Sequence, residues 1–221
     1  DSVMHSGTGR ISKLLMRPMS LYESGESNGS VSLKEIINGK DINGVSSLDF
    51  DSLINAMMRG GWPESLNISG DNKYKLSKDY IKSLLNEDIK TLDGTVRNSQ
   101  KMAAVLKSLS RNVSTNTSKT TLLEDVKNEF TNEVSRPTLD DYLNILEKLY
   151  ILEYVPATNL NLRSKTPLRV SPKLQLVDPS LVIATLNLKR EDLINDLNFT
   201  GFIFENMCMR DLKIYADAMD A

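Results

Sequence analysis

The sequence predicts a mainly α-helical protein with a few short strands. In most segments apolar residues recur every three or four positions, the spacing that places them on one face of a helix. The chain of 221 residues is 40% apolar and 25% charged, which is typical of a globular protein. It contains one cysteine and one histidine. A disulfide framework and a cysteine-based zinc site are therefore excluded, and a Ser-His-Asp triad is not expected.

Residues 11–22 predict the first element, a strand that Pro18 interrupts because proline has no N–H to donate to a ladder. Helical spacing follows three times, over Leu33–Asn38, Leu48–Arg59 and Ser77–Ile89. Gly60 and Gly61 end the second of these helices, and Ser77 is the expected N-cap of the third.

The middle of the chain has the element order of a winged helix-turn-helix, which is three helices followed by a β-hairpin. The helices are predicted over Ser99–Leu109, over Thr120–Phe130, and from Arg136 to Tyr150. Thr138 and Asp141 are spaced as a capping box for the third helix. The strands are predicted over Ile151–Val155 and Leu168–Val177, on either side of a basic loop.

Two further helices are predicted after the hairpin, over Ser180–Leu186 and Asp192–Asp217, with a break in the second near Gly201. The longest apolar runs are only a few residues, so no segment is expected to span a membrane. The chain also shows no signal-peptide pattern, and we expect a cytoplasmic protein.

Charge is uneven along the chain. The net charge of −2 divides into −2 over residues 1–96, +4 over 97–177 and −4 over 178–221. A basic segment can attract nucleic acid, usually through the last helix of a helix-turn-helix. Here the polar face of that helix carries a net −2 and would repel phosphates; it comprises Asp140, Asp141, Asn144, Glu147 and Lys148. Any DNA contact is therefore expected in the wing, through Arg163, Lys165 and Arg169, and the alternative is a solvated basic loop.

The sequence lacks the motifs of several enzyme classes. The phosphate-binding loop is absent, since Asp41 follows Gly39-Lys40 and Lys34 stands where the first glycine would be. No zinc-protease or nucleophile-elbow motif is present. We therefore predict no metal site and no ATPase activity for this chain.

Short motifs along essentially the whole chain carry a family resemblance. In order and spacing, the sequence resembles prokaryotic AAA+-type ATP-binding proteins whose C-terminal half is a domain of unknown function. The motifs are His5–Arg10, Met16–Gly25, Gly60-Gly61-Trp62-Pro63, Tyr142–Leu149, Ser171–Lys173, Asp178–Leu181 and Gly201–Glu205.

The resemblance implies a place for this chain within a longer protein. The phosphate-binding loop and the Mg²⁺-binding strand of such proteins lie upstream, and a restriction-endonuclease-like domain lies downstream. ATP and Mg²⁺ would then bind the full-length protein and not this chain alone. The implied parts are the last strand region of the ATPase core (1–30), its helical lid (31–94), the winged helix (95–178) and helices leading to the next domain (179–221).

The resemblance also implies roles for particular residues. Gly60, Gly61 and Pro63 are similar to a Gly-x-Pro motif whose proline packs on adenine; the alternative is a helix C-cap with a buried Trp62. Arg10 matches an arginine that would neutralise γ-phosphate charge, as an arginine finger or phosphate sensor does, or else anchor a strand by a salt bridge.

Three functions are compatible with these observations. The first is a regulatory module in which the lid and the winged helix couple nucleotide state to the nuclease-like domain. The second is a DNA-binding module acting through the wing, and the third is a protein-interaction scaffold. Self-association is compatible with each of them.

Overall fold

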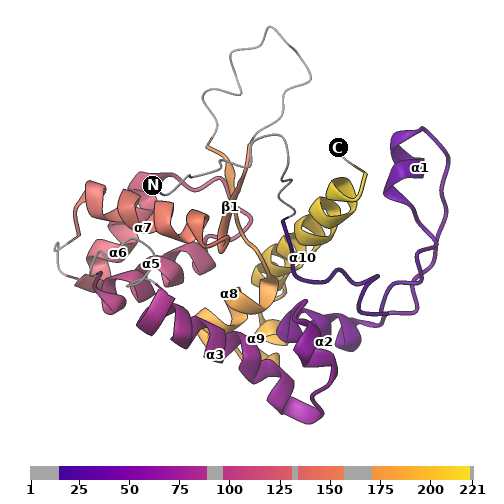
Figure 1. Ribbon diagram of the computed structural model, residues 1–221, viewed down its shortest axis with the longest axis horizontal. Helices are drawn as coiled ribbons and strands as arrows, with labels where there is room; N and C mark the ends of the chain where they lie inside the picture. The colour runs from indigo at the N-terminus through magenta and orange to yellow at the C-terminus, as the bar shows by residue number, and fades with distance from the viewer. Residues whose placement is uncertain (1–14, 89–96, 131–133, 157–170, 220–221) are drawn as a thin grey trace, which may run out of the picture.

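The computed structural model describes residues 15–88, 97–130, 134–156 and 171–219. Over these residues the protein is mainly helical with one small antiparallel sheet, as the sequence predicts. The helices are α1 (Leu33–Ile37), α2 (Phe50–Arg59), α3 (Lys75–Ser83), α5 (Ser99–Arg111), α6 (Lys119–Phe130), α7 (Arg136–Lys148), α8 (Pro179–Leu186), α9 (Arg190–Asn195) and α10 (Leu197–Asp217) (Figure 1). Short 3₁₀ turns η1 (Pro63–Leu66) and η2 (Gly70–Tyr74) precede α3, and a π-helical turn η3 (Leu84–Asp88) follows it.

Helix α8 lies at the centre of the molecule (Figure 1). Its sequence is apolar around most of its circumference, which favours a helix enclosed by other elements. Pro179 to Ile183 are all buried, and α8 packs against α2, α3, α5 and α10. A single core therefore contains helices that precede residues 89–96 in the sequence and helices that follow them. The expected domain division at residue 94 stays a prediction, because that position lies outside the described residues.

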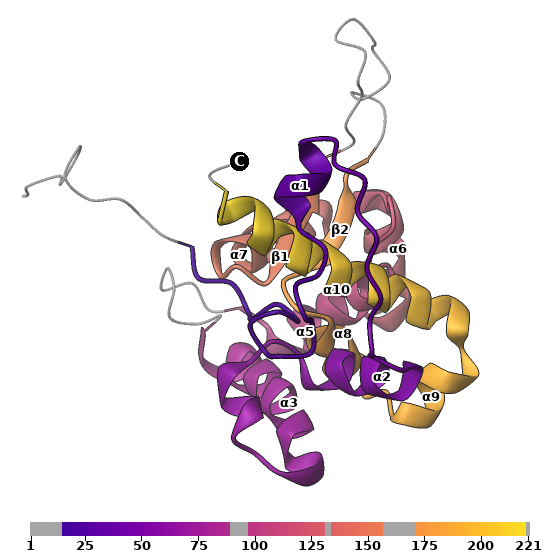
Figure 2. The ribbon, with the colours of Figure 1, turned by 90° about the vertical axis from the view of Figure 1, so that its right-hand side faces the viewer.

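The helices α5, α6 and α7 lie together beside a β-hairpin (Figures 1 and 2). Strand β1 (Leu152–Val155) pairs antiparallel with β2 (Lys173–Leu176), and Leu152 lies opposite Leu176. Helix α5 packs against α6 and α7, and α7 packs against β1. The buried side chains of this group include Met102, Leu106, Leu109, Leu122, Val126, Leu139, Leu143 and Leu146.

The strand predicted over residues 11–22 is wrong for the part that the structure describes. Residues 15–20 have no regular structure, and a turn follows from Leu21. Pro18 has no N–H, and the N–H of Ser20 donates to the Glu23 side chain at 2.7 Å. The N–H of Met19 donates to the carbonyl of Gly61 at 2.7 Å. The segment is therefore held by separate bonds and not by a ladder.

Three predicted helix details are also corrected. The last helix continues through Gly201, and the chain instead breaks at Asp196, whose carboxylate caps α10. Ser135, and not Thr138, caps α7. Ser77 is buried inside α3 and is not its N-cap. In each capped helix a short polar side chain one position before the first turn satisfies a free backbone N–H.

Candidate functional site

Part of the predicted site lies in the described chain. Gly60, Gly61 and Pro63 form the turn between α2 and η1. The roles predicted for four other residues stay predictions, because these residues lie outside the described part of the chain: Arg10, Arg163, Lys165 and Arg169.

The glycine turn is packed too closely for side chains. Gly60 has φ +73°, in the region that favours glycine, and a Cβ there would overlap Asp178 Oδ1 and Ser180 Oγ. A Cβ on Gly61 would overlap the backbone of Met19. The two glycines thus allow the chain after α2 to lie directly against α8 and the N-terminal segment.

Asp178, the residue before α8, binds the glycine turn. Its carboxylate is fully buried and accepts a hydrogen bond from Gly61 N–H at 2.8 Å. It also caps α8, accepting from Ser180 N–H at 2.9 Å and from Ser180 Oγ at 2.6 Å. A buried carboxylate needs several donors and a countercharge, and these contacts supply the donors.

The countercharge is Arg210 on α10. Its Nη1 donates to Asp178 Oδ2 at 2.9 Å, and its Nη2 lies 2.7 Å from Asp211 Oδ1. Burial disfavours the charged guanidinium, but the two carboxylates outweigh it and raise the pKa of Arg210. Asp211 in turn accepts from the N–H of Leu21 at 2.9 Å. One buried network thus connects the N-terminal segment, the glycine turn, α8 and α10.

Trp62 is attached to the same network. Its Nε1 donates to Ser180 Oγ at 2.8 Å, and its ring centroid lies 5.1 Å from that of Tyr80 on α3, tilted by 37°. The hydrogen bond to Ser180 and the ring contact with Tyr80 together fix the position of the indole.

Pro63 and Trp62 line a cavity of about 280 Å³. Five of the lining residues carry rings: Pro18, Trp62, Pro63, Tyr80 and Tyr150. Tyr150 lines it from the end of α7, and Arg17 contributes its polar side. Such a space, mostly apolar with a few polar groups, suits a flat ring system.

Tyr150 has an unusual backbone. Its φ is +56°, a conformation in which glycine or asparagine commonly ends a helix, and the residue is 61% exposed. The turn is closed by hydrogen bonds from Tyr150 N–H to Glu147 O at 3.0 Å and from Ile151 N–H to Leu146 O at 2.9 Å. Strained backbone of this kind is common at functional sites, so the ring of Tyr150 is a candidate for contact with a ligand.

Ion pairs enclose the polar side of the cavity. Arg17 Nη1 lies 2.5 Å from Glu153 Oε1, and its Nε lies 2.6 Å from Asp217 Oδ2. Lys213 Nζ lies 2.5 Å from Glu153 Oε2. Burial raises the pKa of Glu153, but Lys213 and Arg17 outweigh this effect and lower it.

Two acids on the polar face of α7 form ion pairs. Asp140 lies 2.6 Å from Lys119 Nζ, and Asp141 accepts two bonds from Arg97, at 2.8 and 2.9 Å. These carboxylates are therefore engaged with neighbouring segments, which reduces the negative charge that this face presents.

Two structural features are absent from the described part of the chain. None of its helices combines the length and apolar character needed to cross a membrane. It also contains no group of three or more His, Cys, Asp or Glu residues placed to hold a metal ion.

Sequence reasoning missed the roles of three residues here. Asp178 and Arg17 lie in motifs that carry the family resemblance, but nothing in their spacing indicates which residue each one binds. Tyr150 gives no sequence signal, because its left-handed backbone depends on how α7 meets β1. The glycines and Pro63, by contrast, are identifiable from the sequence, and the structure adds the partners that surround them.

Comparison with protein families gives the affiliation of the chain. No curated protein and no solved structure matches the chain. A family model described as "Domain of unknown function (DUF8612)" matches residues 50–192. That span includes the glycine turn, Tyr150 and Asp178, whereas Arg17 and Arg210 lie outside it. Because the match covers more than half of the 221 residues, the chain belongs to the DUF8612 family.

Proposed function

We propose that the cavity lined by Trp62 and Pro63 holds the adenine ring of a nucleotide, and that the chain is a nucleotide-dependent regulatory module. The observation that carries the proposal is the position of these two residues. They line an aromatic cavity, and their neighbours Gly60 and Gly61 contact the buried network beneath it.

The cavity suits a base by its shape and chemistry. The rings of Pro63, Trp62 and Tyr80 offer flat apolar surfaces, and the exposed ring of Tyr150 is placed to cover a bound base. The described residues contain no phosphate-binding loop and no metal-ligand cluster. The role proposed for these residues is therefore limited to the base, and Mg²⁺ and the phosphates would need groups from elsewhere in the full-length protein.

The network provides a route from the base to the C-terminal helix. A shift of Trp62 acts on Ser180 through the 2.8 Å bond, and Ser180 and Gly61 share Asp178 as their acceptor. Asp178 is bound to Arg210 on α10. In this proposal α5–α7 and the β1–β2 hairpin form a winged helix-turn-helix that moves with α8 and α10; their order and the antiparallel strand pair support that assignment.

The test is ATP binding and turnover by the full-length protein. Pro63→Ala should weaken ATP binding at least about fivefold, since about 1 kcal/mol of ring contact is lost. Arg10→Ala should lower turnover with a smaller effect on affinity. Pro172→Ala, outside the cavity, is the matched control. Unchanged affinity in Pro63→Ala together with unchanged turnover in Arg10→Ala would contradict the proposal.

A further inference from the structure

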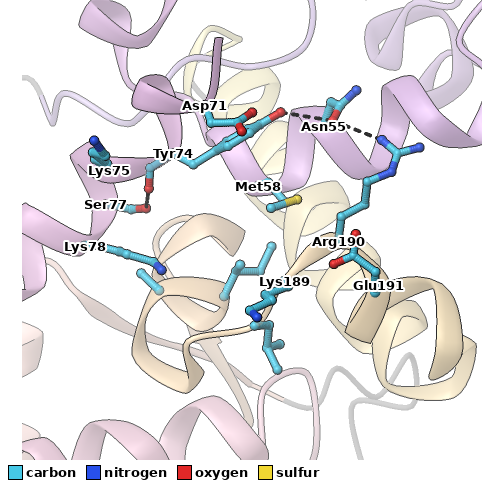
Figure 3. A pocket seen from close by; sticks show the side chains of 13 residues that line it. Asn55, Met58, Asp71, Tyr74, Lys75, Ser77, Lys78, Lys189, Arg190 and Glu191 are labelled. Atoms are coloured by element: carbon cyan, nitrogen blue, oxygen red, sulfur yellow. Dashed lines mark hydrogen bonds between the residues drawn. The ribbon is translucent and has the colours of Figure 1, made fainter.

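A second, larger cavity is lined by other residues of α3. It has a volume of about 470 Å³, within the range usual for small-molecule sites, and is formed by α2, η2, α3, the end of α8 and the start of α9 (Figure 3). Every residue that lines it falls within the span matched by the family model. It shares no lining residue with the cavity at Trp62 and Pro63.

The charge of this cavity is opposite to that of the chain. Four cationic side chains and two carboxylates line it, which gives +2, whereas the whole chain carries −2. The cations are Lys75, Lys78, Lys189 and Arg190, and the carboxylates are Asp71 and Glu191.

Within the described residues, Arg190 is the one cation of the four with an ion pair, whereas Lys75, Lys78 and Lys189 have none. Lys78 Nζ donates to the amide oxygen of Asn187 at 2.8 Å, which is a neutral partner. Lys189 forms no ion pair within the described ranges. Both side chains extend into the cavity, Lys78 from α3 and Lys189 from the segment before α9 (Figure 3). Two uncompensated ammonium groups in one concave site attract an anion.

The rest of the cavity combines an apolar floor with an ordered rim. Met58, Ile183 and Leu188 supply apolar surface. At the rim, Asn55 Oδ1 accepts from Tyr74 OH at 3.0 Å and from Arg190 Nη1 at 3.4 Å (Figure 3). Arg190 also pairs with Asp51, so the rim is fixed by contacts from α2, η2 and α9.

We propose that this cavity binds a small organic anion, a phosphate monoester whose apolar part lies on Met58, Ile183 and Leu188 and whose phosphate lies between Lys78 and Lys189. The phosphate dianion would supply the missing countercharge, and the ester group would cover the apolar floor. The site is independent of the base-binding cavity, and neither proposal depends on the other.

The test is calorimetric titration of the chain with phenyl phosphate, with inorganic phosphate and phenol as partial probes. Phenyl phosphate should bind more tightly than either partial probe, because only it combines both groups. Lys78→Gln with Lys189→Gln should weaken binding by about tenfold or more, the effect of losing two charge-assisted contacts. Glu191→Gln should strengthen it, because one like charge is removed. Lys82→Gln, on the outer side of α3 and paired with Asp79, should leave the affinity unchanged.

Three results would overturn this proposal. One is binding of phenyl phosphate weaker than about 10 mM. Another is equal affinity for inorganic phosphate, which would exclude a role for the apolar floor. The last is an equal loss in Lys82→Gln and in the double lysine variant, which would indicate a general charge effect. The thermal midpoints of the variants, measured without ligand, verify that each one is folded.

Discussion

Arg210 on α10 bonds to Asp178 at the start of α8 over 2.9 Å, with 2% and 0% of the two side chains exposed. This buried ion pair lies where four segments that are distant in the sequence meet. Asp178 also binds the glycine turn after α2, and Arg210 also binds Asp211, which holds the N-terminal segment.

Arg210→Met should destabilise the fold by about 3–5 kcal/mol, because it leaves the Asp178 carboxylate buried without its countercharge. The measurement is urea unfolding at pH 7. The double variant Asp178→Asn, Arg210→Met should lose less than Arg210→Met alone, since it removes the unpaired charge. Lys173→Gln breaks a pair whose side chains are 41% and 38% exposed, and should cost below about 1 kcal/mol. A loss in Arg210→Met as small as that of Lys173→Gln would contradict the assignment.

Gly60→Ala should destabilise far more than Gly70→Ala, although both glycines have positive φ, +73° and +64°. A Cβ on Gly60 would overlap Asp178 and Ser180, whereas a Cβ on Gly70 would meet nothing within 4 Å. Gly70→Ala should therefore cost about 1 kcal/mol from the backbone alone. Denaturant midpoints for the two variants give the comparison. An equal loss of stability in the two variants would mean that the close approach of the turn to α8 does not require glycine at position 60.

Tyr150→Gly should stabilise the fold and weaken the proposed base binding. Glycine relieves the left-handed backbone at φ +56°, worth about 1 kcal/mol, while the exposed ring at the cavity is lost. The measurements are the thermal midpoint and the affinity for adenosine. Tyr150→Ala serves as the control, because it removes the ring without relieving the backbone. If Tyr150→Gly lowers the midpoint, the ring contributes to stability and the functional interpretation of its strained backbone is wrong.

Glu153 should make stability sensitive to acid. Its pKa is lowered in the folded protein by Lys213 and Arg17, against the effect of burial. A carboxylate with a depressed pKa stabilises the fold above its ordinary value of 4.5, and this stability is lost as the pH falls below it. Glu153→Gln should lower the free energy of unfolding by about 2 kcal/mol at pH 7. The thermal midpoint of the variant should also fall less steeply than that of the wild type as the pH is lowered. Thermal midpoints between pH 3 and 7 test this. A variant curve parallel to the wild type over that range would exclude Glu153 as a source of the acid sensitivity.

Local patterns predict the regular elements well. The apolar spacing within α2, α5, α6 and α7 defines helices whose ends agree with the structure to within about two residues, because each helix packs one apolar face against the core. The strands predicted over Ile151–Val155 and Leu168–Val177 correspond to β1 and β2, although β2 begins only at Lys173 in the described part of the chain.

The errors have more than one cause, and distant contacts account for the one around Pro18. Around Pro18 the sequence has strand-like composition, but its polar groups bond to Gly61, Asp211 and α10 and not to a neighbouring strand. Glycine at position 201 predicts a break in the last helix, yet Gly201 lies inside α10, in open space where a Cβ would meet nothing within 4 Å. Asp196 follows α9 and caps α10. Only its backbone geometry distinguishes Asp196 from the other acidic residues, so the sequence does not identify it as the cap.

The candidate site is predictable only in part, again because of a distant contact. The glycines and Pro63 form a contiguous motif, which a sequence displays directly. Their partner Asp178 lies more than 100 residues away, and the pairing follows from how α8 is enclosed by the other helices.

The central claim is that a base binds against Trp62 and Pro63. Trp62 is the single tryptophan of the chain, so its fluorescence reports on this cavity alone. Titration with adenosine should change the emission of Trp62 along a saturable curve, with a Kd on the order of 0.1–1 mM for a base without its phosphate contacts. Pro63→Ala should shift the curve to higher concentration, and Pro172→Ala should not. An emission that stays constant throughout the titration, or that changes identically in Pro63→Ala, would contradict the claim.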